Sequence, residues 1–415
     1  MKRTKFDLWL AGICAGRVFN GLVFMTYAAA LPILQQEWAM SGVQAGSIAS
    51  GFQLAYAVSL IVLSGLADRI SARTVYLVSQ FATAICALVF AFFARDYVSG
   101  LIFHTLLGLA LGGTYTTGIM IIADQYVPTS RGMAVGSYIA STSFGYALSL
   151  VISGIALPVG GYKLSFLLTC LGPTLAWLLA WMTLRHTLVP LQERRSEQKF
   201  TTEVLGNRRA MLLIVGYTFH SWELLGMWSW TPAFMAACLG VAGLTGVKAA
   251  GSGANIVALF HFMGLVASLS AGVLSDRLGR SHVMLAMATV STICSLAFGW
   301  TIGLPLAVVI AVGVVYALSS LGDSPVLSAA LTEVTEPSYL GAALGLRSLL
   351  GFGAGAIAPL AFGAILDWSN PLADGQRHYL TWGWAFSLLG VGGMGAVWAI
   401  YRYGRQRDFR PQDEN

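Results

Sequence analysis

The segment GGTYTTGIMIIADQYVPTSRGMAVGSY, residues 112–138, aligns with LGDSPVLSAALTEVTEPSYLGAALGLR, residues 321–347, when the chain is shifted by 209 residues. The shift places Asp124 over Glu333. It also superposes three pairs of glycines, namely Gly113 with Gly322, Gly132 with Gly341 and Gly136 with Gly345. Repetition at a fixed distance indicates a duplicated structural unit. The chain is therefore expected to consist of two related halves.

A second pair of segments repeats at almost the same distance. GLADRISAR, residues 65–73, corresponds to GVLSDRLGR, residues 272–280, with Asp68 over Asp276. The longest polar stretch lies between the two copies and is typical of a solvated linker. The expected domains are an N-terminal bundle over residues 1–188, a linker over 189–209, a C-terminal bundle over 210–404 and a tail over 405–415.

The composition places most of the chain in a lipid bilayer. Hydrophobic residues make up 56% of the 415 residues and charged residues only 10%, whereas soluble domains carry roughly 25% charged residues. An apolar helix of about 20 residues crosses a bilayer. The first apolar stretch is too long for a cleaved signal peptide, and further apolar stretches follow it too closely, so we expect it to be the first span. The twelve expected spans cover residues 8–36, 43–67, 74–94, 97–123, 133–158, 164–185, 210–239, 250–274, 281–303, 305–331, 339–366 and 380–402.

The net charge of +6 reflects membrane topology, so no nucleic-acid partner is expected. Most of the 24 Lys and Arg residues fall on one side of the proposed spans, and only Arg95, Lys163, Lys248 and Arg377 fall on the other. By the positive-inside rule, both termini and the linker are expected in the cytoplasm and the protein in the inner membrane. The five Cys residues stand singly, without the spacing of a metal or redox site.

These features together resemble the major facilitator superfamily, whose signature is G-x-x-x-D-R-x-G-R between helices 2 and 3, with an echo between helices 8 and 9. Residues 272–280 fit the pattern closely, residues 65–73 depart from it at Ser71 and Ala72, and RGMAVG, residues 131–136, is similar to the family's start of helix 5. The resemblance implies an all-α membrane protein with twelve transmembrane helices in two six-helix bundles, usually a monomer, which rock about a midplane site. In that fold helices 3, 6, 9 and 12 lie peripherally and the other eight line the pathway.

The loop motifs and their neighbours supply the candidate gating residues. An Asp flanked by Arg at a tight turn can pair with neighbouring helix ends in one conformation and release them in the other. The alternative is that these charges only anchor the loops on one side of the membrane. The candidates are Asp68, Arg69, Arg73, Asp276, Arg277, Arg280, Asp124, Arg131 and Glu333.

Ionisable residues inside apolar spans are costly and normally face a pathway. Arg17 and Arg347 each lie about nine residues into a span, which at 1.5 Å per residue is roughly 13 Å deep. A guanidinium stays charged in a cavity and matches a carboxylate with its planar fork, so the two arginines favour an anionic substrate. The alternative is two structural ion pairs that Arg17 and Arg347 form with Glu223 and Asp323.

The same spans contain candidate groups for proton coupling and for substrate contact. Glu223, Asp323 and His104 are the candidates for exchanging a proton as access alternates. Aromatic and polar residues occur together in HSWELLGMWSWTPAFM, residues 220–235, as they do in small-ligand pockets. Beside the two arginines, the candidate substrate-binding residues are His220, Trp222, Trp230, Tyr27, His261 and Asn255.

We therefore expect a secondary active transporter of a small anion, in particular a carboxylate, driven by proton coupling or exchange. The sequence contains no nucleotide-binding motif and no spacing typical of a metal site or an enzyme nucleophile, so no cofactor, bound metal or catalysis is expected. The alternatives are a copper importer that uses Met227, Met235, His220, His261 and Met263, a multidrug exporter and, least favoured, a membrane sensor.

Overall fold

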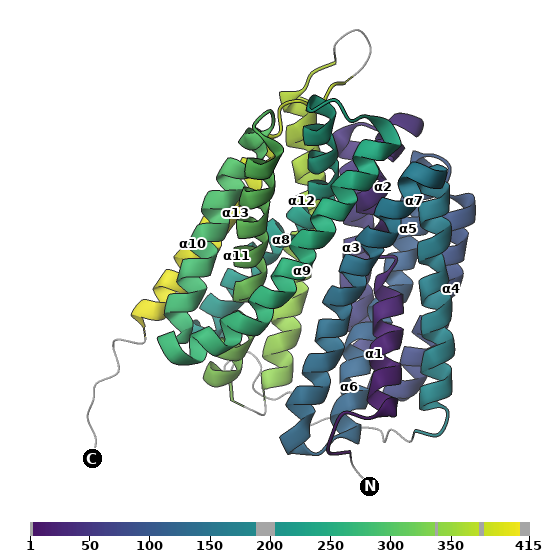
Figure 1. Cartoon of the computed structure of the whole chain (residues 1–415). Helices are drawn as coiled ribbons and strands as arrows, with labels where there is room; N and C mark the ends of the chain where they lie inside the picture. Colours follow the sequence, from purple (N-terminus) through teal and green to yellow (C-terminus); the bar gives the residue numbers. More distant parts are fainter. Residues whose placement is uncertain (1–2, 188–203, 337–338, 373–376, 407–415) are drawn as a thin grey trace. The chain divides into compact units, whose positions relative to one another are not determined.

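The computed structural model describes residues 3–187, 204–336, 339–372 and 377–406 (Figure 1). Almost all of these residues are helical, and β-structure within them is one isolated bridge between Arg3 and Tyr126. Much of the expected linker and nearly all of the expected tail lie outside the described residues. The chain divides into two compact units: unit 1 is Met1–Arg195 with Trp228–Phe262, and unit 2 is Ser196–Met227 with Met263–Asn415.

The N-terminal half supplies six spans, two of which are broken helices. The first span is broken into α1 (Leu8–Gly21) and α2 (Thr26–Glu37). The second and third are α3 (Gly42–Ala67) and α4 (Ala72–Phe93). The fourth is broken into α5 (Tyr97–Leu111) and α6 (Tyr115–Gln125), which are joined by the 3₁₀ turn η1 (Gly112–Thr114). Neither break was expected from the sequence, because a break in mid-span leaves an apolar stretch unchanged.

The last helix of this half, α7 (Pro128–Leu184), crosses the membrane twice. Its 57 residues would extend about 85 Å at 1.5 Å per residue, whereas the hydrocarbon core is about 30 Å thick. The backbone leaves helical geometry at Gly160 and Gly161, and Gly161 has a φ of 64° that favours glycine. α7 therefore provides the fifth and sixth spans, as the sequence predicted.

The C-terminal half supplies six further spans. They are α8 (Arg208–Val241), α9 (Gly246–Leu278), α10 (Arg280–Phe298) with the 3₁₀ turn η3 (Gly299–Thr301), α11 (Leu306–Val334), α12 (Leu340–Ser369) and α13 (Gly383–Arg405). Within the described residues, eleven helices are long and apolar enough to cross a membrane. Because α7 counts twice, the prediction of twelve spans is confirmed.

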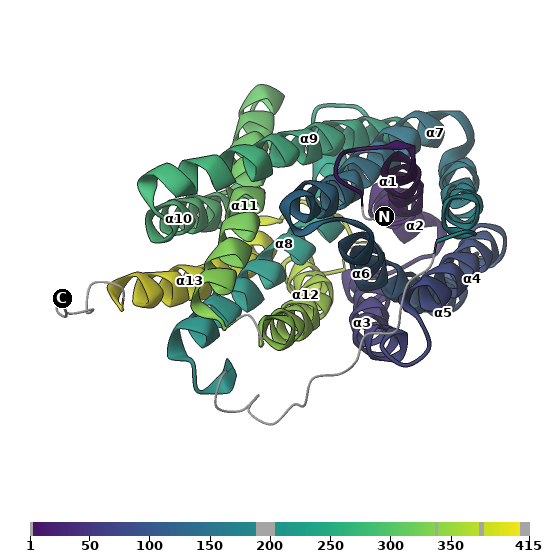
Figure 2. The ribbon, with the colours of Figure 1, turned by 90° about the horizontal axis from the view of Figure 1, so that it is seen from below.

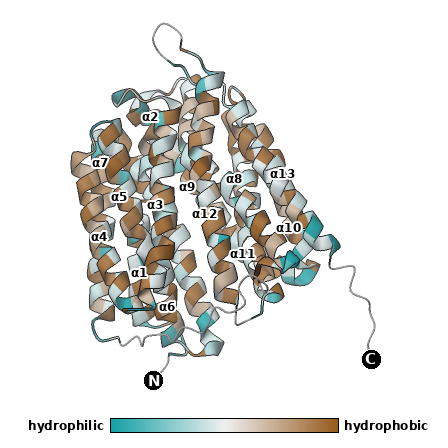
Figure 3. Cartoon of the chain, turned by 180° about the vertical axis from the view of Figure 1, so that it is seen from behind, coloured by the Kyte–Doolittle hydropathy of each residue, from teal (hydrophilic) through white to brown (hydrophobic). Residues whose placement is uncertain are grey.

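Several helices present an apolar face to their surroundings. Val78, Phe81, Ile85 and Phe92 recur on one side of α4 and are all exposed, and hydrophobic residues run along the length of the helices while hydrophilic ones gather toward their ends (Figure 3). A water-soluble protein rarely exposes so much apolar surface. These faces are therefore suited to contact lipid.

Glycines let the helices of unit 1 approach closely. In α7, a Cβ at Gly145 would lie 2.6 Å from the Val18 carbonyl oxygen of α1, and in α5 a Cβ at Gly108 would collide with the Phe52 carbonyl of α3. Small residues at such contacts permit backbone-to-backbone packing in membranes. The resulting pairs, α1 with α7 and α3 with α5, hold the break after Gly21 and the side chains near it in place.

In unit 2, α10 packs against both α11 and α13 (Figure 2). Tyr316 of α11 donates a hydrogen bond to Ser295 of α10 at 2.9 Å, and Ser295 donates to the Phe386 carbonyl of α13 at 3.2 Å. A chain of neutral hydrogen bonds thus links three helices inside this unit. Two of these helices, α10 and α13, also lie against a carboxyl group on α8, described below.

Candidate functional site

Arg17 lies inside unit 1 on α1, where it is only 3% exposed. Its Nε donates to the Thr142 hydroxyl of α7 at 2.7 Å, and its Nη1 donates to the Thr114 hydroxyl of η1 at 3.1 Å. The guanidinium also lies over two aromatic rings, 5.1 Å from the centroid of Tyr115 and 5.5 Å from that of Tyr138. The fold therefore surrounds a buried cation with neutral partners.

No carboxylate among the described residues lies within 4.0 Å of the Arg17 guanidinium. The alternative of a structural ion pair is therefore not seen for this residue. Burial of a charge without a counter-charge costs several kcal/mol, at about the scale of breaking a buried ion pair. A bound anion would supply the missing charge, and a carboxylate accepts hydrogen bonds from a guanidinium in a bidentate geometry.

Four aromatic rings gather beside Arg17. Phe24, in the break between α1 and α2, stacks on Tyr146 of α7 with ring centroids 4.2 Å apart. Phe24 meets Phe52 of α3 edge-on at 5.3 Å and Trp228 of α8 edge-on at 6.3 Å, and Trp228 lies 5.6 Å from Tyr146. Tyr146 lies one helical turn after Thr142 on α7, on the same face as the hydroxyl that binds Arg17. These four rings, here called the aromatic cluster, form an apolar surface next to a cation.

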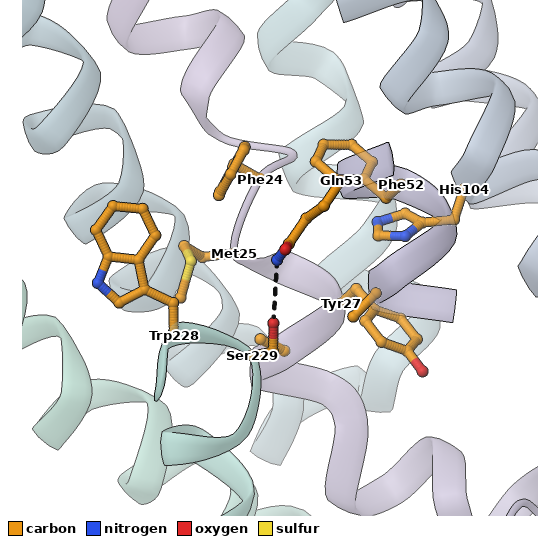
Figure 4. Close-up of a pocket in the computed structure, with 10 residues that line it drawn as sticks. Phe24, Met25, Tyr27, Phe52, Gln53, His104, Trp228 and Ser229 are labelled. Atoms are coloured by element: carbon orange, nitrogen blue, oxygen red, sulfur yellow. Dashed lines mark hydrogen bonds between the residues drawn. The ribbon is translucent and has the colours of Figure 1, made fainter. Parts of the chain in front are cut away.

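A small pocket with a volume of about 20 Å³ adjoins the aromatic cluster (Figure 4). Gln53 Nε2 donates to Ser229 Oγ across it at 3.2 Å. Gln53 Oε1 and His104 Nε2 are buried without a hydrogen-bond partner among the described residues. This space, here called the Gln53 pocket, is lined by Phe24, Met25, Tyr27, Ala28, Ala49, Phe52, Gln53, His104, Trp228 and Ser229.

Two residues singled out from the sequence line this pocket. His104 on α5 is 2% exposed; its Nδ1 lies 3.4 Å from the Ile48 carbonyl oxygen and its ring stacks on Phe52 at 4.5 Å. The Tyr27 hydroxyl donates to the Ala45 carbonyl at 2.9 Å, so Tyr27 faces the pocket mainly with its ring, 5.0 Å from the ring of His104. A role of His104 in proton coupling stays a prediction.

Unit 2 contains a buried histidine–aspartate pair. His220 Nδ1 of α8 lies 3.0 Å from Asp323 Oδ1 of α11, and both side chains are almost fully buried. Asp323 thus pairs with a histidine and not with Arg347. The half-buried Arg347 donates to the Ser328 hydroxyl and lies 4.2 Å above the ring of Tyr217. As for Arg17, no carboxylate of the described residues lies within 4.0 Å of its guanidinium.

The two arginines have matching surroundings. The repeat of 209 residues places Tyr138 over Arg347. In unit 1, Arg17 comes from the first span and Tyr138 from the fifth. In unit 2 the order is reversed, because Tyr217 comes from the seventh span and Arg347 from the eleventh. Each half therefore holds a guanidinium of one span against a tyrosine ring of another, with the two residue types exchanged between the corresponding spans.

Glu223 points toward helices that the family resemblance placed at the periphery. Its Oε1 accepts a hydrogen bond from Ser291 of α10 at 2.7 Å, and a Cβ at Gly393 of α13 would lie 2.8 Å from its Oε2. Its neighbour Trp222 donates a long hydrogen bond of 3.4 Å to the Leu388 carbonyl of α13. The roles expected for Glu223 in proton coupling and for Trp222 in substrate binding stay predictions.

The remaining candidate substrate-binding residues have different surroundings. Trp230 is fully buried. His261 lies 5.3 Å from Trp228, between ring centroids, and its Nε2 has no hydrogen-bond partner among the described residues. Asn255 is exposed on α9 beside Gly154 of α7. None of the three lines the Gln53 pocket, so their expected roles stay predictions.

The second loop motif forms an ion-pair network in unit 2. Arg280 Nη1 lies 2.8 Å from Asp276 Oδ1, and Arg280 Nε lies 2.8 Å from Glu333 Oε1 of α11. Glu333 is the residue that the repeat places over Asp124. The network therefore joins two of the repeated segments within one half of the chain.

The first loop motif is connected differently. Arg73 Nη2 donates to the Arg185 carbonyl at 3.0 Å, and Asp124 Oδ2 accepts from the adjacent Gln125 amide at 2.9 Å. This copy also departs from the family signature in sequence. Among the described residues, no side-chain hydrogen bond or ion pair is found for Asp68, Arg69, Arg131 and Arg277. A gating role for any of these charges stays a prediction.

Sequence reasoning missed several residues of the site in unit 1. Phe24 and Phe52 looked like ordinary apolar residues of a span, and Thr142 and Thr114 like ordinary small polar ones. The available signal was the dipeptide Asn20–Gly21, which is typical of a turn and lies directly before the break. The partners of Arg17 depend on helix faces, which apolar length alone does not determine.

Comparison with known proteins identifies the family. The model of the Major Facilitator Superfamily matches residues 13–260 and 245–414. The hexuronate transporter of Bacillus subtilis is 24% identical over 417 residues, covering 96% of this chain and 93% of that protein. The niacin transporter of Acinetobacter baylyi is 28% identical over 166 residues, covering 39% of this chain and only 36% of that relative.

Solved structures agree on the fold. The nucleoside transporter NupG has a TM-score of 0.74 at 13% identity, covering 96% of this chain and all of that one. A D-xylose-proton symporter has a TM-score of 0.72 at 15% identity, covering 95% of this chain and 97% of that one. With the duplicated halves, the twelve spans and the signature loop, these matches lead to one conclusion: the chain belongs to the Major Facilitator Superfamily and is a multi-pass membrane transporter.

Proposed function

We propose that this protein transports a small organic carboxylate by coupling its movement to protons. The observation that carries the proposal is the environment of Arg17, a buried guanidinium whose described partners are all neutral. An arginine cannot escape the cost of burial by losing its proton. Its charge therefore favours an anionic ligand over a neutral or cationic one.

The body of the substrate is expected to be flat or apolar. In the aromatic cluster beside Arg17 the rings contact one another, and aromatic walls with a few polar groups are typical of small-ligand sites. Two relatives are a hexuronate transporter and a niacin transporter, and both of these substrates are carboxylates of small ring compounds. They support the substrate class without distinguishing its members.

Arg347 is proposed as a second anion-binding residue, in unit 2. Like Arg17 it has a tyrosine ring and a hydroxyl group as partners. A second cation raises the local positive potential along the path of an anion and opposes the entry of cations. This argues against a cationic drug as the substrate.

Proton coupling is assigned to the pair of His220 and Asp323. The two side chains are 3.0 Å apart and buried, so a proton taken up or lost there changes a charge that water does not screen. Buried ionisable groups of this kind mark proton relays in membrane transporters. A similarity in fold to a proton symporter agrees with this assignment.

We assign the protein to the inner membrane, with both termini in the cytoplasm, and expect it to work as a monomer. The assignment follows from the uneven distribution of Lys and Arg. Reporter fusions at the C-terminus test it: alkaline phosphatase is expected to be inactive and a cytoplasmic fluorescent reporter active. The reverse pattern would exclude this topology.

The test of function is uptake into proteoliposomes with an acidic exterior, using radiolabelled benzoate, niacin and a hexuronate. Arg17→Gln is expected to lower uptake of each transported acid by at least about 30-fold, because loss of a buried charge partner costs about 2–5 kcal/mol. Arg95→Gln is the matched control, since Arg95 is exposed in a loop, and its effect is expected to stay within about twofold. Normal uptake by Arg17→Gln would refute the proposal.

A further inference from the structure

We infer that the Gln53 pocket is a specificity subsite that binds a hydroxyl group on the ring of the substrate, opposite the carboxylate. This inference rests on the proposed function, because it concerns the far end of the same ligand. It assigns Gln53 and His104 as the groups that select among ring-bearing acids.

The two side chains are built into the pocket. Gln53 is 6% exposed and His104 is 2% exposed, and both line the same space between the α1–α2 break, α3, α5 and α8. Figure 4 shows the amide of Gln53 and the imidazole of His104 on neighbouring parts of the wall. Their positions are fixed by the Ser229 hydroxyl, which binds the Gln53 amide, and by the Phe52 ring, which stacks on His104.

Both side chains leave an acceptor without a partner. Gln53 uses its Nε2 as donor to Ser229, which leaves Oε1 as a buried acceptor. His104 Nδ1 faces the Ile48 carbonyl oxygen, a group that only accepts, so we assign the ring proton to Nδ1. The neutral imidazole then has a lone pair on Nε2, which is also buried and without a partner among the described residues.

Two unpartnered acceptors in one small pocket define the chemistry of the ligand. A buried acceptor without a donor is unfavourable, and a ligand that brings a donor recovers that loss. A phenolic hydroxyl or a ring N–H meets this need, whereas an unsubstituted ring or a ring nitrogen that only accepts does not. Sites built to hydrogen-bond a substrate hydroxyl reject the analogue that lacks it.

The surroundings favour a planar ring as the carrier of that hydroxyl. Phe24 belongs both to the aromatic cluster beside Arg17 and to the wall of the pocket. Arg17 and the pocket are connected through α7, because Arg17 binds Thr142 and Phe24 stacks on Tyr146, one helical turn further along α7. A benzoic acid with a hydroxyl group at C4 has its two polar ends on opposite sides of such a ring.

The test compares competition by benzoate and by 4-hydroxybenzoate against uptake of one labelled carboxylate. The wild type is expected to prefer the hydroxylated acid. Gln53→Leu and His104→Phe are each expected to reduce that preference about tenfold, as expected for loss of one hydrogen bond to a desolvated group. Competition by benzoate itself is expected to change by no more than about twofold.

Gln80→Leu is the matched control, because Gln80 is a buried amide on α4 that does not line the pocket. Gln53→Met, which keeps an unbranched side chain, serves as a second variant if Gln53→Leu does not fold. An unchanged preference in the Gln53 and His104 variants, an equal change in Gln80→Leu, or no preference in the wild type would each overturn the subsite. If Arg17→Gln still transports carboxylates, the proposed function fails, whatever the hydroxyl preference shows.

Discussion

Arg17 donates a hydrogen bond of 2.7 Å from Nε to the hydroxyl of Thr142, joining α1 to α7. The bond fixes the direction of the guanidinium while adding no negative charge. Substitution of Thr142 therefore tests the positioning of Arg17, and substitution of Arg17 tests the proposed binding of an anion.

Thr142→Val is expected to raise the KM for the transported carboxylate by roughly fivefold to tenfold, because hydrogen bonds to charged groups contribute about 1.5–3 kcal/mol and only part of this concerns orientation. Thr142→Ser keeps the hydroxyl and is expected to behave like the wild type. Initial rates of uptake over a range of substrate concentrations give the KM. Equal KM values for the valine variant and the wild type would show that Thr142 does not position Arg17.

Asp323→Asn and His220→Gln are expected to abolish accumulation driven by a pH gradient while leaving exchange of labelled for unlabelled substrate intact. Exchange returns the carrier with substrate bound and needs no net proton movement, whereas accumulation does. The carboxyl group of Glu223 contacts Ser291 instead, so the Glu223→Gln variant is expected to retain both accumulation and exchange. Loss of accumulation in Glu223→Gln alone would move the coupling site from the His220–Asp323 pair to Glu223.

The network of Arg280 with Glu333 is expected to affect transport rate more than stability. Exposed ion pairs contribute only about 0–1 kcal/mol, and Glu333 is 46% exposed. Arg280→Glu is therefore expected to slow uptake with little change in melting temperature, and the exchanged pair Arg280→Glu with Glu333→Arg to restore part of the rate. A double variant as slow as the single one would show that this pair does not control the rate.

Gly108→Ala is expected to destabilise the contact between α3 and α5 by about 1–3 kcal/mol, because a methyl group there collides with the Phe52 carbonyl. Gly65→Ala is the control, since a methyl group at that position meets no atom within 4 Å. Thermal unfolding in detergent, followed by fluorescence, compares the two. Equal melting temperatures would mean that α3 shifts without loss, contrary to the packing described here.

The sequence predicted the parts of this structure that depend on length and charge. Apolar length and the repeat predicted twelve spans in two halves, and the cost of burying charge pointed to Arg17 and Arg347. The sequence did not predict the breaks before Thr26 and after Leu111, because a turn in the middle of a span does not change the length of the apolar segment.

The partners of the charged residues could not be predicted, because they depend on which face of each helix packs inward. Under the alternative of structural ion pairs Asp323 would balance an arginine, but it lies against His220. Glu223 is one turn from His220 along α8, yet it contacts α10. Likewise, the sequence did not predict that Phe24 stacks on Tyr146, because this contact depends on the break in the first span.

The most direct test of the central claim compares each acid with its uncharged amide. Niacin and nicotinamide, or benzoate and benzamide, have nearly the same shape and differ in the negative charge that Arg17 is proposed to hold. Binding to the purified protein, measured by calorimetry, is expected to favour the acid by at least about 30-fold in the wild type. In Arg17→Gln that preference is expected to disappear through weaker binding of the acid, with binding of the amide unchanged. An acid preference of the same size in Arg17→Gln would contradict the account.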